Sequence, residues 1–381
     1  TSGSTGNPKG VMITHQNIVN FILGEKEHIS FDIGKVMVSV TTICFDIFAL
    51  ELWGALTSGI PLVLANDIEQ VTPVQLKDLC MKHHVTMMQT TPSRYSTLLT
   101  DIHNKDEFWN QLTDIMVGGE PFPKLLLDRL STVTKAKIFN MYGPTETTVW
   151  STIKDLSDST HITIGKPIAN TTCYILDHNK NLLPIGVSGE LYIGGDGVAR
   201  GYWNREELTE EKFIKSPFSD DEIIYNTGDL AYFDHTGELV HLGRNDSQIK
   251  IRGYRIELEE IENKILEFPS ISHCVVNPVN SSTKLCAYYI SNQEIDLSDL
   301  KATLLDALPN YMVPNYFIRM EAFPYTPNGK IDRKSLPTPK VEVNKEVVSA
   351  RNDLDTILVN ILKDLLKLEV VDIETSIYDL G

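Results

Sequence analysis

The first ten residues, TSGSTGNPKG, combine the residue types that bind a polyphosphate. Glycines let backbone N–H groups approach an anion, the hydroxyl side chains add further donors, and Lys9 adds a full positive charge. The segment is not a Walker A loop, because Pro8 precedes Lys9 and Gly10 follows it. A flexible Gly/Ser linker is the alternative interpretation. The apolar segment 11–13 follows directly, and it favours a phosphate-binding loop in front of a strand.

A second candidate is the segment NMYGPTET at 140–147, which follows a predicted strand and contains a tight Gly-Pro turn. In it, Tyr142 could stack on a base, Thr145 could bond a phosphate oxygen, and Glu146 could hold Mg²⁺. A plain loop with a core tyrosine explains the same residues equally well.

Three later segments carry weaker signals. In YNTGDL at 225–230, Asp229 follows a turn, where its carboxylate could bind a ribose diol or simply form an Asx turn. Cations are concentrated at 243–257, which is either a functional surface or a solvated face. Lys330 lies at a glycine turn, which favours a catalytic lysine over a solubility residue. The glycine-rich run at 189–197, with RGYW at 200–203, is interpreted as a β-hairpin scaffold.

The elements that must position these residues alternate between short apolar strands and amphipathic helices. We expect strands at 36–40, 61–65, 86–89, 114–117 and 137–141, and helices at 14–22, 48–56, 73–83, after 92–93 and at 124–130. This order predicts an α/β core with a largely parallel sheet, whose ligands gather beyond the carboxyl ends of the strands. The phosphate loop, Asp46, 118–120 and 140–146 all fall at or near such ends.

From about Ser151 the pattern changes to short strands and turns, which predicts a β-rich subdomain attached to this core. Its expected strands are 171–177, 189–194, 230–233 and 238–242, and HTG at 235–237 makes a tight turn between the last two. The segment 247–339 predicts a small α+β domain, with strands at 248–251, 273–279 and 284–290 and helices at 258–267 and 297–308. A polar linker and an amphipathic helix at 354–368 follow.

Composition excludes several classes of protein. The 381 residues carry a net charge of −17, which argues against a nucleic-acid partner. No apolar run is long enough to span a membrane, and no signal peptide opens the sequence. The five cysteines form no C-x-x-C, so we expect reduced core thiols in a cytoplasmic protein. The pair His83 and His84 is interpreted as a helix end rather than a metal site.

Taken in order, these motifs resemble the adenylation domain of nonribosomal peptide synthetases, from the first residue to about Pro339. The resemblance implies an incomplete large subdomain at 1–245, truncated at its N-terminus because the family has a region before the phosphate loop. It further implies a small mobile subdomain at 246–339, a linker at 340–350 and, at 351–381, the beginning of a peptidyl carrier domain. The modified serine of that carrier would lie beyond Gly381.

The resemblance also implies a role for each matching residue. The nucleotide site would comprise Ser2, Thr5 and Lys9 at the β- and γ-phosphates, Gly118, Gly119, Glu120 and Tyr142 around adenine, Asp229 at the ribose and Arg244 at the ribose and phosphate. Thr145 and Glu146 would bind the α-phosphate and Mg²⁺, and Lys330 would bridge the substrate carboxylate and the α-phosphate. Asp246 would be the hinge of the small subdomain. The implied cofactors are ATP, Mg²⁺ and a phosphopantetheine carried by a partner domain.

The resemblance identifies Asp46, directly after Phe45, as the group that neutralises the substrate's α-ammonium group. The side-chain pocket would consist of Asp46, Ile47, Leu50, Gln89, Met116, Gly118, Met141, Val149, Trp150 and Lys330. This set resembles the pattern of glycine-activating domains. Bulky residues such as Trp150, Met116 and Met141 leave little room beyond Cα, although core packing would explain them equally.

The predicted function is therefore ATP-dependent activation of an amino acid, with glycine as the preferred substrate, followed by transfer to the thiol of a carrier domain. Neighbouring synthetase domains are the expected partners. Two alternatives remain open. One is an acyl- or aryl-CoA ligase of the same superfamily, which would not need Asp46. The other is a catalytically silent nucleotide-binding module.

Overall fold

A computed structural model describes residues 9–101, 105–159, 161–244, 248–251, 254–279, 284–324, 331–339, 351–366 and 373. The chain divides into two compact units, Thr1–Glu260 and Ile261–Gly381, and each is described by itself. The subdomain boundary predicted at 245/246 stays a prediction, because the expected hinge Asp246 lies outside the described residues.

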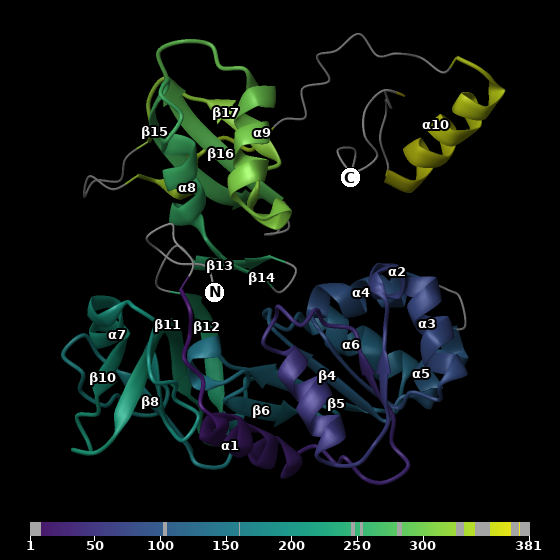
Figure 1. Ribbon diagram of the computed structural model, residues 1–381, viewed down its shortest axis with the longest axis vertical. Coiled ribbons are helices and arrows are strands. Elements are labelled where there is room, and N and C mark those ends of the chain that lie inside the picture. The colour runs from purple at the N-terminus through teal and green to yellow at the C-terminus, as the bar shows by residue number, and fades with distance from the viewer. Residues whose placement is uncertain are drawn as a thin grey trace. The chain divides into compact units, whose positions relative to one another are not determined.

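The first unit is built on a seven-stranded sheet with the order β2-β1-β3-β4-β5-β6-β7. Figure 1 labels β4, β5 and β6 of this sheet. Its strands are β1 (Met37–Ser39), β2 (Leu62–Leu64), β3 (Met87–Thr90), β4 (Asp114–Gly118), β5 (Lys137–Tyr142), β6 (Thr152–Asp155) and β7 (Lys166–Pro167). Strands β1 to β5 pair in parallel, whereas β6 and β7 pair antiparallel to their neighbours. The expected α/β core is confirmed, and its sheet extends beyond the change of pattern at Ser151.

Two apolar layers cover this sheet, one on each face. On β4, Ile115 and Val117 pack into one cluster and Met116 into the other, as the alternation of side chains along a strand requires. One layer holds α3 (Pro73–Lys82), α4 (Pro92–Thr100), α5 (Lys105–Gln111) and α6 (Lys124–Val133). The opposite layer holds α1 (His15–Lys26) and the π-helical turn η1 (Leu50–Gly54). A short α2 (Asp67–Val71) precedes α3.

Local sequence explains where these helices begin. The Thr14 hydroxyl accepts the Asn17 N–H at 3.2 Å, and the Asn17 side chain accepts the Thr14 N–H, so the predicted N-cap of α1 is confirmed as a full capping box. Both α3 and α4 begin with a proline. Proline suits the first helical turn because it lacks a backbone N–H, and an N–H at that position would have no acceptor within the helix. Helix α5 was not predicted, and η1 replaces the middle of the regular helix expected at 48–56.

A five-stranded antiparallel sheet follows, which confirms the β-rich subdomain. It contains β8 (Thr171–Leu176), β9 (Gly189–Gly195), β10 (Phe213–Lys215), β11 (Ile223–Phe233) and β12 (Leu239–Arg244), with α7 (Glu206–Lys212) between β9 and β10. The predicted turn joins β11 to β12, and Gly237 there has φ 74°, a conformation that glycine adopts without strain. The run at 189–197 forms a central strand of the sheet rather than a hairpin of its own.

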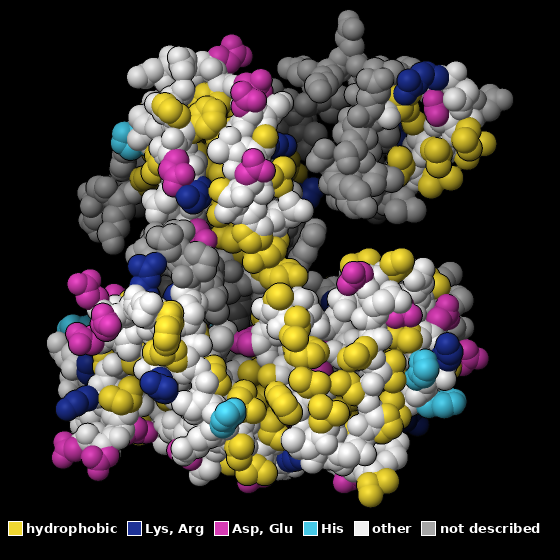
Figure 2. Space-filling model, in the orientation of Figure 1, with side chains coloured by type: hydrophobic (Ala, Val, Ile, Leu, Met, Phe, Trp, Pro, Cys, Tyr) yellow, Lys and Arg dark blue, Asp and Glu magenta, His cyan; other side chains and the backbone are white. Residues whose placement is uncertain are grey.

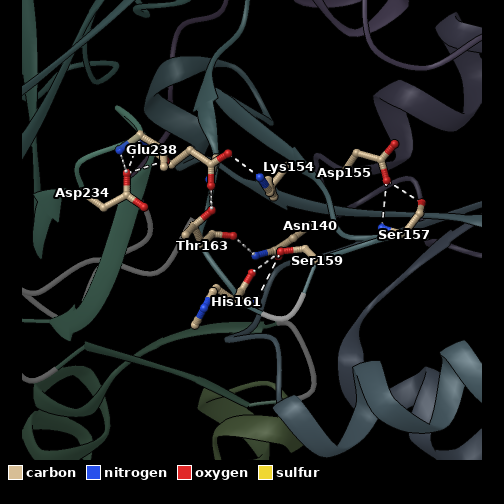
Figure 3. A network of polar contacts seen from close by, with 11 residues as sticks. Asn140, Lys154, Asp155, Ser157, Ser159, His161, Thr163, Asp234 and Glu238 are labelled. Atoms are coloured by element: carbon tan, nitrogen blue, oxygen red, sulfur yellow. Dashed lines mark hydrogen bonds and ion pairs between the residues drawn. The ribbon is translucent and has the colours of Figure 1, made fainter.

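A polar network ties this turn to the main sheet (Figure 3). Glu238 pairs with Lys154 of β6 and accepts the Thr163 hydroxyl at 2.9 Å. The Asn140 side chain on β5 donates to the Thr163 carbonyl at 2.7 Å. These contacts fix the end of β5, from which the segment 140–147 leaves the sheet.

The remaining elements begin with the hairpin β13 (Gln248–Ile251) and β14 (Tyr254–Glu257). The second unit contains α8 (Leu258–Leu266), which crosses its boundary, β15 (Ile271–Val279), β16 (Lys284–Ser291), α9 (Leu297–Ala307) and β17 (Tyr316–Arg319). Short 3₁₀ turns lie at Asn310–Met312 and Arg333–Ser335. The expected α+β fold is confirmed, with β17 as an unpredicted strand parallel to β16.

Helix α10 (Asp353–Leu366) confirms the amphipathic helix expected near the end of the sequence. Its Leu354, Ile357, Leu358 and Ile361 are half exposed or more, and Figure 2 shows hydrophobic side chains on the surface of this helix. The sequence from 367 onward, apart from residue 373, lies outside the described residues.

All five cysteines are free. Cys80, Cys274 and Cys286 are buried and Cys173 is partly buried, but Cys44 is exposed, so the expectation of core thiols is wrong for Cys44. His83 caps the C-terminus of α3, which confirms the interpretation of the histidine pair as a helix end. Among the described residues, no helix is both long and apolar enough to cross a membrane.

Candidate functional site

Tyr142, Asp229 and Arg244, which the sequence predicts around a nucleoside, lie together at the junction of the two sheets of the first unit. The Tyr142 hydroxyl donates to the Asp229 carboxylate, and an Arg244 guanidinium nitrogen lies 3.4 Å from the same carboxylate. His241 contributes a ring nitrogen 3.3 Å from Asp229. The pairing of β11 with β12 sets this arrangement, because Asp229 lies opposite Arg244 in its register.

The environment of Asp229 keeps its carboxylate ionised. Burial alone would raise its pKa, but the hydrogen bond from His241 and the charge of Arg244 together hold the pKa of Asp229 below its ordinary value. Burial, and then the neighbouring negative charge of Asp229, raise the pKa of Tyr142 well above its ordinary value. Tyr142 is therefore a neutral hydroxyl donor beside a fixed anion.

A second cluster surrounds Glu146, the predicted Mg²⁺ ligand, which is fully buried. The Lys9 ammonium lies 3.6 Å from its Oε1, and the Tyr202 hydroxyl donates to the same oxygen at 2.7 Å. Lys9 also lies over the Tyr202 ring, 4.9 Å from its centroid. Lys9, at the end of the predicted phosphate loop, and the segment 140–147 are thus brought together, although they lie far apart in the sequence.

The backbone between Gly143 and Trp150 turns sharply to place Glu146. A Cβ at Gly143 would lie 2.5 Å from the Val149 carbonyl oxygen, so only glycine fits there. After the short turn η2 (Thr145–Thr147), Thr148 and Val149 have φ of 66° and 70°. β-branched residues rarely adopt this region, and each such residue costs about 1–3 kcal/mol. Strained backbone of this kind clusters at functional sites, which favours a functional loop over a plain one.

Asp46 contacts the same turn at Thr145. Its carboxylate accepts a hydrogen bond from the Thr145 hydroxyl. The residue predicted to neutralise a substrate ammonium group therefore contacts the residue predicted to bind the α-phosphate. The amine and the carboxylate of one small substrate are close together, so the residues that bind its amine and the reacting phosphate would also need to be close. The hydrogen bond between Asp46 and Thr145 meets that requirement.

The predicted side-chain pocket lies behind Asp46, in the apolar layer that contains α1. Its members in this cluster are Ile47, Leu50, Met116, Met141, Val149 and Trp150. Trp150 is 2% exposed and its indole N–H donates to the Gln89 side-chain oxygen at 2.9 Å. The indole reaches across to Gly118, where a Cβ would lie 2.5 Å from the ring. The indole therefore occupies the space that a side chain at this position would need.

The predicted adenine segment 118–120 begins at Gly118, the last residue of β4. Gly119 has φ 84°, which favours glycine. Glu120 turns toward the start of α4, where its carboxylate accepts the Ser93 N–H at 3.0 Å and the Ser93 hydroxyl at 2.7 Å. These hydrogen bonds fix the loop that begins at Gly118.

A cavity of about 410 Å³ opens beside this region. Its lining includes Phe45, Ile47, Thr90, Thr91 and Arg94. Ile47 is the residue that this cavity shares with the predicted side-chain pocket, and the predicted phosphate-binding residues Thr145 and Glu146 are not among its lining.

Four of the predicted site residues, Ser2, Thr5, Asp246 and Lys330, lie outside the described residues. Sequence reasoning missed Ser93, Tyr202 and His241, which hold predicted site residues in place. Tyr202 belongs to the RGYW segment that was interpreted as scaffold, and its position next to Glu146 depends on contacts that no local pattern encodes. His241 faces Asp229 through the β11–β12 pairing, which a hairpin prediction could have indicated.

The family model described as "AMP-binding enzyme" matches residues 1–203. Gramicidin S synthase 2 from Aneurinibacillus migulanus is 41% identical over 388 residues, covering 100% of this chain and 9% of that protein. Bacitracin synthase 3 from Bacillus licheniformis is 40% identical over 387 residues, covering 100% of this chain and 6% of that protein. The chain therefore spans only a small part of the length of these relatives.

Two solved structures of nonribosomal peptide synthetases are also similar to this chain. A holo four-domain nonribosomal peptide synthetase bound to AMP and glycine is 37% identical, with a TM-score of 0.59 over 98% of this chain and 28% of that one. A holo nonribosomal peptide synthetase protein with adenylation and PCP domains is 27% identical, with a TM-score of 0.80 over 97% of this chain and 63% of that one.

Proposed function

Because the chain belongs to the family of AMP-binding enzymes, we propose that it activates an amino acid with ATP, forming aminoacyl-AMP and releasing pyrophosphate. The aminoacyl group would then pass to the phosphopantetheine thiol of a carrier domain, as part of nonribosomal peptide synthesis. Neighbouring synthetase domains are the proposed partners, and the reduced thiols suit a cytoplasmic protein.

The contact between Asp46 and Thr145 is the observation that carries this proposal. A carboxylate directly beside a phosphate-binding hydroxyl would repel an anionic substrate, unless it pairs with a cation. The ammonium group of an amino acid supplies that cation, whereas an acyl or aryl acid does not. The contact therefore favours amino-acid activation over the acyl- or aryl-CoA ligase alternative.

The residues of this chain also fit ATP and Mg²⁺. Asp229 is an ionised acceptor suited to hydroxyl groups such as those of a ribose, and Tyr142 offers an aromatic surface beside it. The Glu146 carboxylate is a hard oxygen ligand of the kind that Mg²⁺ takes, and Lys9 beside it suits phosphate oxygens. Mg²⁺ would neutralise phosphate charge while these residues orient the substrates.

We further propose glycine as the substrate. The Trp150 indole and the thioether side chains of Met116 and Met141 are buried where a substrate side chain would extend. Exclusion of alanine would rest on steric clash, since the loss of a methyl contact alone discriminates by only about 1–3 kcal/mol. The 37% identical synthetase bound to AMP and glycine supports the same choice.

Amino-acid-dependent ATP–pyrophosphate exchange, measured across the standard amino acids, tests both proposals. We expect exchange with glycine above all others. Exchange with a different amino acid would reject glycine, and exchange with no amino acid would reject amino-acid activation and favour a silent nucleotide-binding module. An AMP-forming reaction driven by a fatty or aromatic acid would favour the ligase alternative.

The variant Asp46→Ala should lose exchange by at least about 100-fold, because the substrate ammonium group loses its counter-charge. ATP binding, measured by calorimetry, should persist, since the Asp229 and Glu146 clusters do not depend on Asp46. Asp67→Ala, at an exposed carboxylate in α2 of the same unit, is the matched control and should exchange normally. Exchange by Asp46→Ala equal to this control would reject the role of Asp46.

A further inference from the structure

Glu51 is a buried carboxylate that none of the predicted roles uses. It lies on η1, is fully buried, and comes directly after Leu50 of the predicted pocket. Its Oε2 accepts the Ser39 hydroxyl at 2.7 Å and the Thr41 N–H at 3.2 Å. Its Oε1 accepts the Thr41 hydroxyl at 2.5 Å and the Gln89 side-chain N–H at 3.3 Å. Four donors from the ends of β1 and β3 thus converge on one carboxylate.

Gln89 connects this carboxylate to the pocket wall. Its Nε2 donates both to Glu51 and, at 2.8 Å, to the Ile47 carbonyl. Its Oε1 accepts the Trp150 indole N–H at 2.9 Å. Glu51 and the Ile47 carbonyl are acceptors, so they fix the Gln89 amide with its nitrogen toward them and its oxygen toward Trp150. The reversed amide would place a donor against the indole donor.

The position of the indole decides how much space remains at Gly118. The ring atom Cη2 of Trp150 lies 2.5 Å from where a Cβ at Gly118 would be, so the indole is in close contact with the Gly118 backbone. The backbone directly before Trp150 has positive φ at Thr148 and Val149. The hydrogen bond to Gln89 orients the indole N–H on its polar edge.

We propose that Glu51 is a positioning residue for substrate selectivity, acting through Gln89 on the Trp150 indole and so on the size of the amino-acid pocket. The inference rests on the proposed function, since it assumes that the pocket receives an amino-acid side chain. The positively charged guanidinium of Arg94, on α4, interacts electrostatically with the Glu51 carboxylate. Burial raises the pKa of Glu51, while hydrogen bonds from Thr41, Ser39 and Gln89 oppose that rise.

The variant Glu51→Gln tests this inference with almost no change in shape. A glutamine has one acceptor oxygen, so its NH₂ group must face two of the four donors. The hydroxyl groups of Ser39 and Thr41 can rotate and accept instead, but the Thr41 backbone N–H and the Gln89 NH₂ group can only donate. Placing the new NH₂ group at Oε1 turns the Gln89 amide away and breaks its hydrogen bond to Trp150.

The first measurement is the ratio of kcat/KM for glycine to kcat/KM for L-alanine in ATP–pyrophosphate exchange. In Glu51→Gln we expect this ratio to fall by at least about 10-fold, mainly through a lower KM for alanine, because a mobile indole admits an extra methyl group. The kcat for glycine should change little. Glu25→Gln is the matched control: Glu25 is also fully buried in the first unit, on α1, and its carboxylate has no hydrogen bond to any residue that the structure describes. An unchanged ratio in Glu51→Gln, or the same change in Glu25→Gln, overturns the inference.

The second measurement needs no substrate, so it separates this inference from the proposed function. The protein contains four tryptophans, and the indole N–H signal of Trp150 in ¹⁵N spectra can be assigned with Trp150→Phe. In Glu51→Gln we expect this signal to shift and its N–H to exchange faster with solvent, while the signal of Trp109 stays in place. An unchanged Trp150 signal overturns the inference, whichever amino acid the protein activates. If the unaltered protein prefers another amino acid, only the glycine proposal fails. The selectivity ratio is then the kcat/KM for that preferred amino acid divided by the kcat/KM for its homologue with one more methylene.

Discussion

At the scale of single residues, the Glu146 carboxylate has partners from two distant segments. Tyr202 is 2% exposed and donates to Glu146 from outside the segment 140–147. Lys9, at the end of the predicted phosphate loop, lies 3.6 Å from the same oxygen. A group that orients a metal-binding carboxylate contributes to metal affinity although it never touches the metal.

The variant Tyr202→Phe should lower the free energy of unfolding by about 1.5–3 kcal/mol, because it removes a buried hydrogen bond to a charged group. It should also raise the Mg²⁺ concentration needed for half-maximal exchange by about 10-fold. Urea denaturation and a Mg²⁺ titration measure the two effects. Tyr95→Phe is the control, since the equally buried Tyr95 hydroxyl donates to a neutral carbonyl. A Mg²⁺ requirement that rises equally in both variants would contradict the role of Tyr202.

Glu25 provides a prediction about pH. Burial raises the pKa of Glu25 well above the ordinary value of 4.5, so the folded state keeps a proton that the unfolded state releases. The free energy of unfolding should therefore fall as pH rises from about 4.5 toward the folded-state pKa, by at most about 1.4 kcal/mol per pH unit.

Glu25→Gln stays neutral at every pH and should lose this dependence. Compared with the unaltered protein, its relative stability should increase as pH rises from 5 to 7, as urea denaturation at pH 5, 6 and 7 can measure. A stability difference that stays constant over this range would show that Glu25 is already ionised in the folded state.

At the scale of elements, the end of α3 uses a residue that is poorly suited to its backbone. His83 caps the helix, and His84 then adopts φ 52°, in the left-handed region that favours glycine. The Val85 N–H bonds back to the Cys80 carbonyl at 3.0 Å, which is the usual closure of a helix that ends in this way.

His84→Gly should therefore raise the free energy of unfolding by about 1 kcal/mol. The matched control is His83→Gly, because His83 is also exposed but has φ −103°, where glycine gains nothing and adds freedom to the unfolded chain. In thermal denaturation, the midpoint of His84→Gly should lie above that of the unaltered protein, and the midpoint of His83→Gly should lie below it. Destabilisation of both would mean that the His84 side chain makes a contact that outweighs its backbone strain.

At the scale of the whole molecule, the two units divide the predicted chemistry. The first unit contains the predicted nucleotide and substrate residues that lie within the described part of the chain. In the second unit, Arg333 pairs with Glu262 of α8 at 2.9 Å and also donates to the Val276 carbonyl. These contacts anchor the sequence just after Lys330 to the second unit. Lys330 would therefore move with that unit if the unit turns about Asp246, as the family resemblance implies.

Lys330→Ala should abolish formation of the aminoacyl-AMP while sparing thioester formation from preformed aminoacyl-AMP, because the proposed turn withdraws Lys330 before the second step. Pyrophosphate exchange and carrier loading measure the two steps separately. Lys301→Ala, at an exposed lysine of α9 in the same unit, is the control and should affect neither step. Equal loss of both steps in Lys330→Ala would reject the separation.

Sequence alone determined the features that depend on neighbouring residues or on a fixed order of motifs. The alternation of strands and helices predicted the α/β core, and Thr14 predicted the start of α1, because caps and periodic patterns act within a few residues. The residues Asp46, Thr145, Glu146, Tyr142 and Asp229 were found by their types and their order. Each of them could equally have been an ordinary loop residue when taken alone.

Tertiary structure decided which of these residues meet and what holds them. The pairing of Asp46 with Thr145 spans 99 positions and that of Tyr142 with Asp229 spans 87. Tyr202 became visible as a partner of Glu146 only through a contact of this kind, which spans 56 positions. Side chains this far apart in sequence are brought together by strand order and sheet packing, which depend on the burial of the whole apolar layer rather than on any local pattern. For that physical reason the sequence named the chemical groups, and the fold alone assembled them into a site.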